Sequence, residues 1–286
     1  MRLDFPHFPA KLLCRALGVS RSGFYDWLHA RPSARMQEDA RLKVLITAVH
    51  RQTRETYGVP RIKHELAAQG YEVGRDRVRR LRQELNLRCK QRRKFIATTN
   101  SRHDLPVAEN LLEQRFEPTR PNEAWVTDIT YIPTAEGWLY LAGVKDVFTC
   151  EIVGYAMDAR MTQELTTQAL WRAVSHKRPA PGLIHHSDRG SQYCAHSYQA
   201  LVAQFGMRAS MSRRGNCYDN APMESFWGTL KNELVHHRRY ATRAEAKASI
   251  QEYIEIFYNR QRRHSRIGFV PPALFVESFS EQPQAA

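Results

Sequence analysis

The chain has 286 residues, more than one small domain needs and enough for a sizeable core with appended regions. Its 43 Lys and Arg outnumber its 29 Asp and Glu, which gives a net charge of +14 and a pI near 9.8. This excess favours a polyanionic partner, most often nucleic acid, although charge alone leaves an anionic membrane surface open. The sequence has no run of 18 apolar residues, and residues 1–30 lack the layout of a signal peptide.

Cysteine usage indicates a reducing compartment. The five cysteines are odd in number and scattered, without the paired spacing of a metal site. They are Cys14, Cys89, Cys150, Cys194 and Cys217. We therefore expect reduced thiols in a cytoplasmic protein and no cysteine-based zinc site.

The composition divides the chain into four stretches. Residues 1–95 are basic and helical in pattern, and we predict a helix-turn-helix DNA-binding region there. Polar residues and prolines mark a linker at 96–120. Residues 121–240 alternate strands with helices and are predicted to form the catalytic core. Residues 241–286 are predicted to hold a helix, a basic segment and a polar tail, which we expect to be disordered from residue 278.

Two helix-turn-helix patterns occur in the first stretch. Residues 10–16 are predicted to form a short helix, residues 17–19 a glycine turn, and Ser20 the N-cap of a second helix. Residues 57–87 repeat this arrangement, with a second helix that is crowded with arginines. Because clustered arginines repel one another unless phosphates neutralise them, DNA contact is favoured over a solvated helical bundle.

From residue 121 the pattern changes to a mixed α/β order. Strands are predicted at 124–132, 137–147, 151–157, 183–187 and 207–211, and helices at 162–176, 197–205, 222–237 and 242–263. A meander of three strands followed by helix, strand, helix, strand and helix is the order of the ribonuclease H-like fold. We therefore predict an α/β fold with a mixed five-stranded sheet, preceded by the all-α region.

Three carboxylates fall where this fold would bring them together. Asp128 interrupts an otherwise apolar strand, where an unpaired charge is costly unless it binds a metal. Asp188 ends the fourth strand, and Gly190 lets the chain turn just after it. Glu224 lies in the first turns of the helix that Pro222 opens. The first and fourth strands are expected to be neighbours at the sheet centre, with that helix across their ends.

The carboxylates form a donor set of hard oxygens, which suits Mg²⁺ or Mn²⁺ rather than Zn²⁺. Two such ions about 3.5–4 Å apart can activate the attacking oxygen and stabilise the leaving oxygen of a phosphoryl transfer. Asp128, Asp188 and Glu224 are therefore the candidate catalytic and metal-binding residues.

Basic residues near the carboxylates are candidates for holding DNA. Lys231 follows Glu224 by seven residues, on the same helix face, and Gly228 between them would leave the approach open. The alternative for Lys231 is an ordinary solvated lysine. Residues 212–215 form a polar turn, for which DNA contact is favoured over a plain linker. The residues predicted to contact DNA are Arg21, Arg75, Arg77, Arg79, Arg80, Arg82, Arg213, Arg214 and Lys231.

Several other residues near the site are interpreted as structural rather than catalytic. Asp146 follows the second strand, but Asp128 is better placed at the sheet centre. His185 and His186 flank the site and are interpreted as packing or hydrogen-bonding residues. The aromatic residues predicted to be core are Trp138, Phe226 and Trp227.

Several short sequence motifs of this chain occur together in one known protein family. They lie at residues 17–23, 125–130, 186–193, 212–221, 258–260 and 264–265. The 35 residues between Asp188 and Glu224, and a lysine seven residues after Glu224, follow the same pattern. On these features, over residues 10–276, the chain resembles the second-frame transposase (OrfB) of the IS-three family of bacterial insertion sequences, a relative of retroviral integrases.

The resemblance implies a DDE-type transposase with an integrase catalytic core, which cleaves and joins DNA strands with two Mg²⁺ or Mn²⁺ ions. It implies DNA partners, namely terminal inverted repeats and target DNA, and a homo-oligomer. Such transposases usually act as a fusion with an upstream first-frame protein (OrfA), so that protein is an implied partner. The implied location is the bacterial cytoplasm, at the nucleoid.

Two other functions remain open. One is a nuclease or junction-cleaving enzyme of the same fold, which uses the same metals with water as its only nucleophile. The other is a DNA-binding regulator that has lost activity. The intact carboxylates argue against the regulator, and the helix-turn-helix region with the family phrases favours strand transfer over hydrolysis alone.

Overall fold

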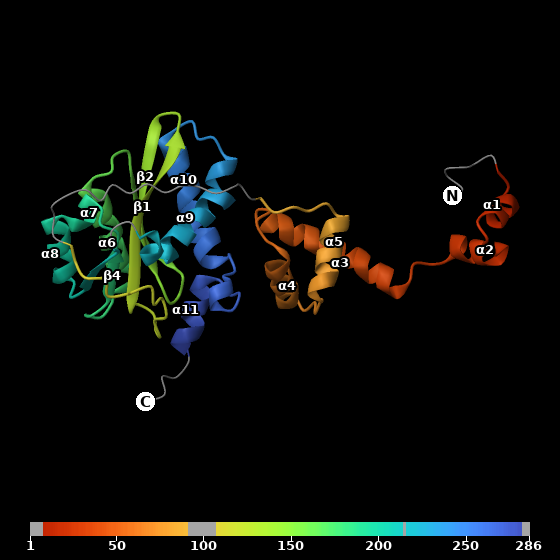
Figure 1. Ribbon diagram of the computed structural model, residues 1–286, viewed down its shortest axis with the longest axis horizontal. Coiled ribbons are helices and arrows are strands. Elements are labelled where there is room, and N and C mark those ends of the chain that lie inside the picture. The colour runs from red at the N-terminus through yellow and green to blue at the C-terminus, as the bar shows by residue number, and fades with distance from the viewer. Residues whose placement is uncertain (1–7, 91–106, 214–215, 282–286) are drawn as a thin grey trace.

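The computed structural model describes residues 8–90, 107–213 and 216–281 (Figure 1). The sheet has the strand order β3-β2-β1-β4-β5. Its strands are β1 (Ala124–Thr134), β2 (Gly137–Asp146), β3 (Ile152–Asp158), β4 (Ile184–Ser187) and β5 (Arg208–Met211). The first three form an antiparallel meander, while β4 runs parallel to β1 and β5 parallel to β4. The predicted ribonuclease H-like order is confirmed, with β1 and β4 as neighbours.

Helices cover both faces of the sheet (Figure 1). One face carries α6 (Gln163–Lys177) and α8 (His196–Gln204), and the other carries α9 (Ala221–Glu233) and α10 (Arg243–Glu252). Successive residues of β1 supply both cores, because side chains alternate along a strand. Trp125 packs with the apolar residues of α6, and Val126 packs with those of α9.

Two glycines let helices approach the sheet closely. A Cβ atom on Gly154 would lie 2.4 Å from the carbonyl oxygen of Ala169 in α6. On the other face, a Cβ atom on Gly143 would lie 2.6 Å from Met223 Cε and 2.9 Å from Trp227 Cη2 in α9. These separations are too short for any side chain, so each glycine determines how near its helix lies to the sheet.

The carboxyl-terminal helices differ from their prediction. α9 ends at Glu233, and a short 3₁₀ turn at Val235–His237 follows it. The helix predicted at 242–263 is divided into α10 and a π-helical stretch, Tyr253–Tyr258. Apolar periodicity alone does not distinguish these helical forms, because their side-chain spacings differ little over one turn.

The expectation of a disordered tail from residue 278 is wrong for residues 278–281, which belong to α11 (Pro272–Glu281). Phe275 and Phe279 pack on Phe148, with ring centroids 5.4 and 5.1 Å apart. This aromatic contact with the loop after β2 stabilises the end of α11, although the polar composition there is typical of an unstructured tail. The rest of the predicted tail, residues 282–286, lies outside the described residues.

The amino-terminal helices follow the predicted pattern. α1 (Ala10–Ala16) and α2 (Arg21–His29) form the first pair, and the Ser20 hydroxyl accepts from Gly23 N at 3.0 Å as a helix N-cap. The second pair consists of α4 (Val59–Ala68) and α5 (Arg75–Glu84). A long helix that the sequence did not single out, α3 (Ala34–Gln52), completes their shared apolar core.

The α3–α5 unit is attached to the carboxyl-terminal segment (Figure 1). Arg263 Nε donates to Glu65 at 2.7 Å, and the backbone N–H of Arg263 donates to the Tyr57 hydroxyl at 2.7 Å. The rings of His64 and Phe269 stack at 4.1 Å. These contacts assign part of the basic carboxyl-terminal segment to holding the helical unit against the core.

The predicted linker at 96–120 begins outside the described residues, and its described part packs on the core. Leu112 is buried, and Leu111 N donates to Ser210 Oγ at 2.9 Å. Met211 N donates to Glu109 O at 3.2 Å. Residues 109–112 therefore run beside β5, close to the loop that precedes α9.

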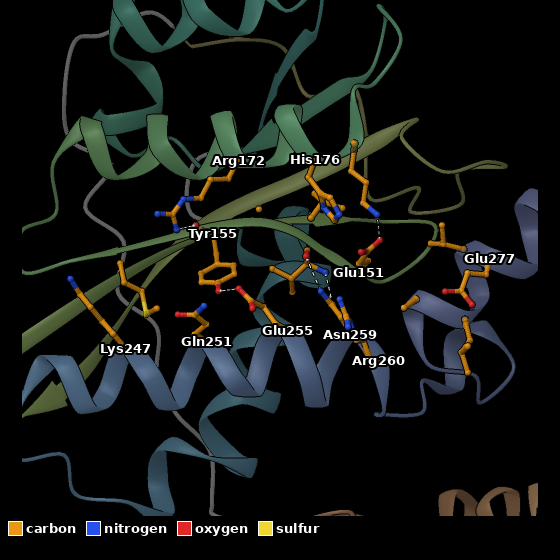
Figure 2. Close-up of a pocket in the computed structure, with 18 residues that line it drawn as sticks. Glu151, Tyr155, Arg172, His176, Lys247, Gln251, Glu255, Asn259, Arg260 and Glu277 are labelled. Carbon is orange, nitrogen blue, oxygen red and sulfur yellow. Dashed lines mark hydrogen bonds and ion pairs between the residues drawn. The ribbon is translucent and has the colours of Figure 1, made fainter.

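Side chains close the outer edge of β3 (Figure 2). The Asn259 amide accepts from Ile152 N and donates to Ile152 O, both at 3.0 Å, as a neighbouring strand would. Arg172 Nη1 donates to Tyr155 O at 2.9 Å. Exposed backbone groups at a sheet edge invite pairing with another chain. Asn259 and Arg172 thus protect this edge.

The cysteines whose side chains are described are free thiols: Cys14, Cys89, Cys150 and Cys194. Burial raises the pKa of the Cys150 thiol, which keeps it protonated. None of the helices within 8–90, 107–213 and 216–281 is long and apolar enough to cross a membrane.

Candidate active site

Asp128 lies in the middle of β1, on the sheet face that α9 covers. Its register partner in β2 is Gly143, so the neighbouring strand places no side chain beside the carboxylate. Trp227, which is buried as predicted, donates its indole N–H to Asp128 Oδ2 at 3.0 Å. The indole fits there because Gly143 has no Cβ. One glycine therefore determines both the approach of α9 and the position of the carboxylate's hydrogen-bond donor.

Asp188 follows β4 directly, and β4 lies beside β1. Its Oδ1 accepts from the backbone N–H of Gly190 at 2.9 Å. This bond fixes the turn into α7 (Ser191–Cys194), a short helix that the sequence did not predict. The carboxylate is thus held where the strand ends, as the predicted fold requires.

Glu224 lies in the first turn of α9, which has Pro222 near its start as predicted. The residue before this helix, Asn220, is buried and donates from Nδ2 to the carbonyl oxygen of Thr127 at 3.0 Å. Thr127 immediately precedes Asp128 in β1. Asn220 therefore ties the start of the glutamate helix to the strand that carries the first carboxylate, a role that nothing in its sequence context indicated.

The carboxylates influence one another's charge. Burial raises the pKa of Asp128, and the charges of Asp188 and then Glu224 raise it further. Burial also raises the pKa of Glu224. Both other carboxylates therefore lie near Asp128, and Asp188 has the larger effect on it. A site that opposes its own negative charge in this way is suited to bind a cation.

The three carboxylates do not by themselves form a closed coordination shell. In the parts of the chain that the structure describes, no three His, Cys, Asp or Glu side chains are close enough to hold one metal ion. The donor chemistry nevertheless fits a divalent cation, because all three side chains are half-buried carboxylates with hard oxygen donors. Ligation of one ion by all three carboxylates requires at least one of these side chains to move.

Lys231 is buried, with 5% of its surface exposed. Its Nζ lies 4.9 Å from the centroid of the Tyr131 ring. Burial lowers the pKa of Lys231 to about 8, and the charge of Asp128 opposes that shift. The ammonium group therefore lies near Asp128. The alternative of an ordinary solvated lysine is wrong.

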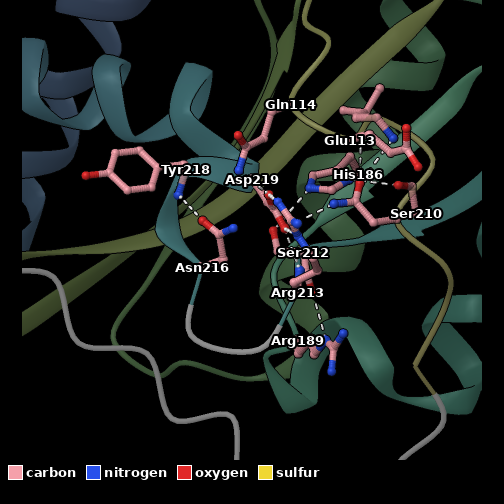
Figure 3. Close-up of polar contacts among 12 residues, drawn as sticks. Glu113, Gln114, His186, Arg189, Ser210, Ser212, Arg213, Asn216, Tyr218 and Asp219 are labelled. Carbon is pink, nitrogen blue, oxygen red and sulfur yellow. Dashed lines mark hydrogen bonds and ion pairs between the residues drawn. The ribbon is translucent and has the colours of Figure 1, made fainter.

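A buried carboxylate that sequence reasoning missed organises the loop before α9 (Figure 3). Asp219 accepts from the backbone N, Nε and Nη2 of Arg213 at 2.7, 3.0 and 2.9 Å. Asn110 and Gln114 donate to it at 3.0 and 2.8 Å. Chiefly through Arg213, the pKa of Asp219 lies well below its usual range. A single aspartate in a polar turn carries no sequence signal of such a role.

This network bears on the two arginines predicted to contact DNA in the same turn. Arg213 is engaged with Asp219, although its side chain remains 58% exposed and can also face a ligand. Arg214 lies outside the described residues.

His185 and His186 make hydrogen bonds within the core, in agreement with their interpretation. His186 contacts Ser210 Oγ through Nδ1 at 2.8 Å and Ser212 Oγ through Nε2 at 3.1 Å (Figure 3). His185 Nε2 lies 2.8 Å from the Tyr198 hydroxyl. Burial lowers the pKa of His185 to about 3 and that of His186 to about 4. Both rings are therefore neutral near pH 7.

Asp146 has a structural role. It is buried and accepts from the backbone N–H groups of Asn122 and Thr149 at 2.7 and 2.8 Å. Trp125 Nε1 donates to it as well, at 3.2 Å. These donors satisfy the carboxylate and fix the turn after β2.

One of the three aromatic residues predicted as core is exposed. Phe226 and Trp227 are buried, but 48% of the Trp138 surface is exposed. Trp138 lies at the tip of the β1–β2 hairpin, where its ring packs edge-on against Tyr131 at 4.9 Å. The prediction for Trp138 is wrong because a strand pattern does not reveal how far the covering helices extend.

Two arginines of α5 are neutralised within the protein. Arg77 Nε and Arg80 Nη2 both pair with Asp39 of α3, at 2.8 and 2.6 Å. Arg77 also pairs with Glu38, and Arg80 with Glu84. Acidic residues of α3 neutralise two arginines of this helix. The expectation that only phosphates neutralise it is therefore wrong.

The remaining predicted arginines of the helical region differ in exposure. Arg79 pairs with Asp76 at the surface, at 2.7 Å. Arg82 Nη2 donates to the carbonyl oxygen of Leu87, in the turn after α5, at 3.3 Å. Arg75 and Arg21 lie exposed at the first positions of α5 and α2. These two are the predicted arginines best placed to meet a phosphate.

A wide groove lies away from the carboxylates. It has a volume of about 1080 Å³ and runs between β3, α6, α10 and α11 (Figure 2). Two charged residues along it, Lys177 and Glu151, form an ion pair at 2.6 Å. None of the three candidate carboxylates lines it. Its size therefore does not make it the reaction site.

Comparison with known families defines the class of the protein. The family "Integrase core domain" matches residues 118–217, and a second family of the same description matches residues 205–272. The family "HTH-like domain" matches residues 37–95. Together with the strand order, these matches define an integrase-type polynucleotidyl transferase that carries a helix-turn-helix-like region and acts on DNA.

Individual relatives narrow this class. The chain is 63% identical to an insertion element IS600 protein of 31 kDa from Shigella sonnei, over 94% of this chain and 99% of that protein. It is 42% identical to transposase InsF for insertion sequence IS3A from Escherichia coli (strain K12), over 94% of each. The chain belongs to the IS3 family of insertion-sequence transposases, and its function is DNA transposition.

Two solved structures are also similar. One is a simian T-cell lymphotropic virus intasome in complex with PP2A regulatory subunit B56 gamma (TM-score 0.48, 14% identity, 84% of this chain and 76% of that one). The other is the HTLV-2 integrase catalytic core domain in complex with magnesium (TM-score 0.43, 16% identity, 56% and 99%).

Proposed function

We propose that the chain cleaves DNA strands at the ends of an insertion sequence and joins them to target DNA. In this proposal Asp128, Asp188 and Glu224 hold two Mg²⁺ or Mn²⁺ ions. The observation that carries it is the placement of the three carboxylates: Asp128 lies in β1, Asp188 follows the neighbouring strand β4, and Glu224 lies in the first turn of α9, whose Trp227 contacts Asp128. Carboxylates that repel one another in the absence of metal gain most from binding a cation.

The chain's own residues prepare the carboxylates for this task. Trp227 orients Asp128, and the Gly190 N–H orients Asp188. Outer contacts of this kind fix the direction of metal ligands. When bound, the ions would activate the attacking oxygen and stabilise the leaving oxygen of an in-line phosphoryl transfer. The protein then has to hold the DNA end and the target in line with them.

A strand-transfer assay tests the proposal and separates it from the two alternatives. The full chain, alone and with the upstream first-frame protein (OrfA), is incubated with labelled terminal-repeat duplex, target DNA and Mg²⁺. A transposase produces joined strands longer than the substrate. A nuclease produces shortened strands alone, and a regulator that has lost activity binds DNA without changing it. Either of these two results contradicts the proposal.

Lys231 is proposed to hold a phosphate of the DNA end beside the metal ions. Lys231→Ala is expected to weaken productive end binding about tenfold, since a hydrogen bond to a charged group contributes about 1.5–3 kcal/mol. Lys231→Arg should retain part of the binding because the charge survives. The measurement is cleavage rate against DNA-end concentration at saturating Mg²⁺. Wild-type kinetics for the alanine variant, with unchanged thermal stability, would remove Lys231 from the site.

The exposed Arg75 is proposed to meet a DNA phosphate, whereas Arg77 has mainly a structural role. Arg75→Gln should reduce the magnitude of the slope of log affinity against log salt by about 0.9, which is one phosphate contact. Arg77→Gln should instead lower the unfolding temperature, because it leaves Asp39 and Glu38 short of a partner. Fluorescence anisotropy over a salt series and thermal unfolding check both. Equal slopes for Arg75→Gln and the wild type would contradict the assignment.

We also propose that the chain works as a homo-oligomer on paired DNA ends, with OrfA as fusion or partner, at the nucleoid in the bacterial cytoplasm. The family membership supports this proposal, because transposition joins two ends of one element.

A further inference from the structure

A smaller cavity, of about 300 Å³, lies behind α9. It is lined by β2, by the start of α9, by the segment at 262–266 and by Arg61 of α4. Helix α9 contributes Pro222, Ser225 and Thr229 to the lining of this cavity. At 3.6 residues per turn, these residues lie on a different helix face from Glu224 and Lys231.

The lining of this cavity is strongly basic. Of the fifteen described residues that line it, five are basic and none is acidic. The basic ones are Arg61, Lys145, Arg262, His264 and Arg266. Within the described parts of the chain, one carboxylate forms ion pairs with this group: Glu233 lies 2.7 Å from Arg262 and 3.7 Å from Arg61. Four Lys and Arg against one Glu give a net charge of three positive, and two of the cations, Lys145 and Arg266, form no ion pair with a described carboxylate.

The cations are close enough to affect one another. Lys145 is buried and donates from Nζ to the carbonyl oxygen of Pro222 at 2.9 Å, a partner without a formal charge. The pKa of Lys145 is lowered to about 8, chiefly by burial and also by the charges of Arg266 and Arg262. Burial and the charges of Arg262, Lys145 and Arg61 likewise lower the pKa of His264. Cations gathered in this way favour binding of an anion.

We propose that this cavity binds a phosphate of the DNA backbone. The inference rests on the proposed function, which makes DNA the substrate, and it adds a contact outside the metal site. Guanidinium and ammonium groups together match the charge and the acceptor oxygens of a phosphodiester. Arg266 and Ser225 are exposed at the cavity and give a strand access to it.

The position of the cavity indicates which phosphate it holds. An α-helix with its side chains is about 10–12 Å across, and the cavity lies on a different face of α9 from Glu224 and Lys231. The phosphate in the cavity is therefore a different one from the phosphate at the carboxylates, on the far side of α9. Because the cavity joins α4, β2 and the segment at 262–266, its occupancy would also couple the helical unit to the core.

The test measures DNA binding by the full chain without metal, so that it does not depend on catalysis. The probe is a fluorescent 30-base-pair duplex in 50 to 200 mM salt. Arg266→Gln is expected to reduce the magnitude of the log–log salt slope by about 0.9, and the wild type should lose about 3.5-fold more affinity than the variant over this range. Lys145→Met should act in the same direction. The matched control is Arg178→Gln, an exposed arginine at the end of α6 on the other face of the sheet.

The outcomes separate the possible occupants. An Arg266→Gln slope equal to that of the wild type overturns the proposal, and so does an equal change in Arg178→Gln. If inorganic phosphate competes with DNA for the wild type but not for Arg266→Gln, the cavity is an anion site that DNA occupies. If phosphate stabilises the wild type against heat while the DNA slope does not change with Arg266→Gln, the occupant is a free anion and the proposal fails.

A second measurement locates the contact. Uncharged methylphosphonate linkages are placed one at a time along the terminal-repeat strand, and binding is measured for the wild type and for Arg266→Gln. The wild type should lose affinity at a linkage other than the cleaved one, and the variant should lose little there. Loss of cleavage in Asp188→Asn does not alter this result, so failure of the metal site and failure of the cavity remain distinguishable.

Discussion

Replacing Asp188 with Asn is expected to lower DNA cleavage and joining by about 10³-fold or more in Mg²⁺, while fold and DNA binding persist. Asn retains an oxygen to accept from the Gly190 N–H but removes the negative charge that a metal ion needs. Loss of about 4 kcal/mol of transition-state stabilisation from a misplaced ion corresponds to about 10³ in rate. The measurement is single-turnover cleavage of a terminal-repeat duplex. Full activity of the variant would remove Asp188 from the site.

The same substitution has a second expected effect that does not depend on activity. Asp188 raises the pKa of Asp128, because a neighbouring negative charge disfavours ionisation. Removing that charge should lower the pKa of Asp128 in the metal-free protein. A carboxyl-carbon NMR titration of both proteins measures this change. An unchanged titration of Asp128 would mean that the two carboxylates are not neighbours.

Asp146→Asn is the matched control for this experiment. Asp146 is a buried carboxylate near the sheet, but its partners are Asn122, Thr149 and Trp125, at the turn after β2. The variant should be less stable by about 1–3 kcal/mol. The amide of the new Asn would place N–H donors beside groups that themselves donate to Asp146 in the wild type. The DNA cleavage rate of Asp146→Asn, measured well below the unfolding temperature of the variant, should remain close to that of the wild type.

Gly143→Ala is expected to lower the cleavage rate about 100-fold and to destabilise the fold by about 1–3 kcal/mol. The new Cβ would lie 2.6 Å from Met223 Cε and 2.9 Å from the Trp227 ring. The end of the Met223 side chain can rotate away. The Trp227 indole is held by its hydrogen bond to Asp128, so α9 must shift instead. A shift of about 1 Å in a catalytic group can cost about 100-fold in rate. Cleavage kinetics and thermal unfolding measure the two effects.

Gly154→Ala separates displacement of α9 from loss of stability. Its Cβ would clash with the backbone of α6, on the sheet face away from the carboxylates. Both variants should unfold at lower temperature than the wild type. Below that temperature, Gly154→Ala should cleave at close to the wild-type rate, whereas Gly143→Ala should not. Equal loss of activity in both would mean that Gly143 matters for stability alone.

Much of the core could be predicted from the sequence because its signals are local. Apolar alternation at residues 124–132 and turn residues between strands specify a meander, and the strand order follows from the order of the elements. Asp128 stood out because a carboxylate in an apolar strand requires a partner. Ser20 could be predicted as a helix cap because capping depends on residues two or three positions away.

The tertiary structure decided what depends on residues far apart in the chain. Lys231 could be placed on the helix face of Glu224 from its spacing, but its burial beside the Tyr131 ring depends on β1, far earlier in the chain. The charge of α5 depends on Asp39, nearly forty positions earlier in the chain. The basic cavity likewise joins Arg61, Lys145 and Arg266. Burial and charge pairing act through space and fall off over a few ångströms, so sequence spacing does not report them. The residue types were visible in the sequence, but their electrostatic environment was determined by the fold.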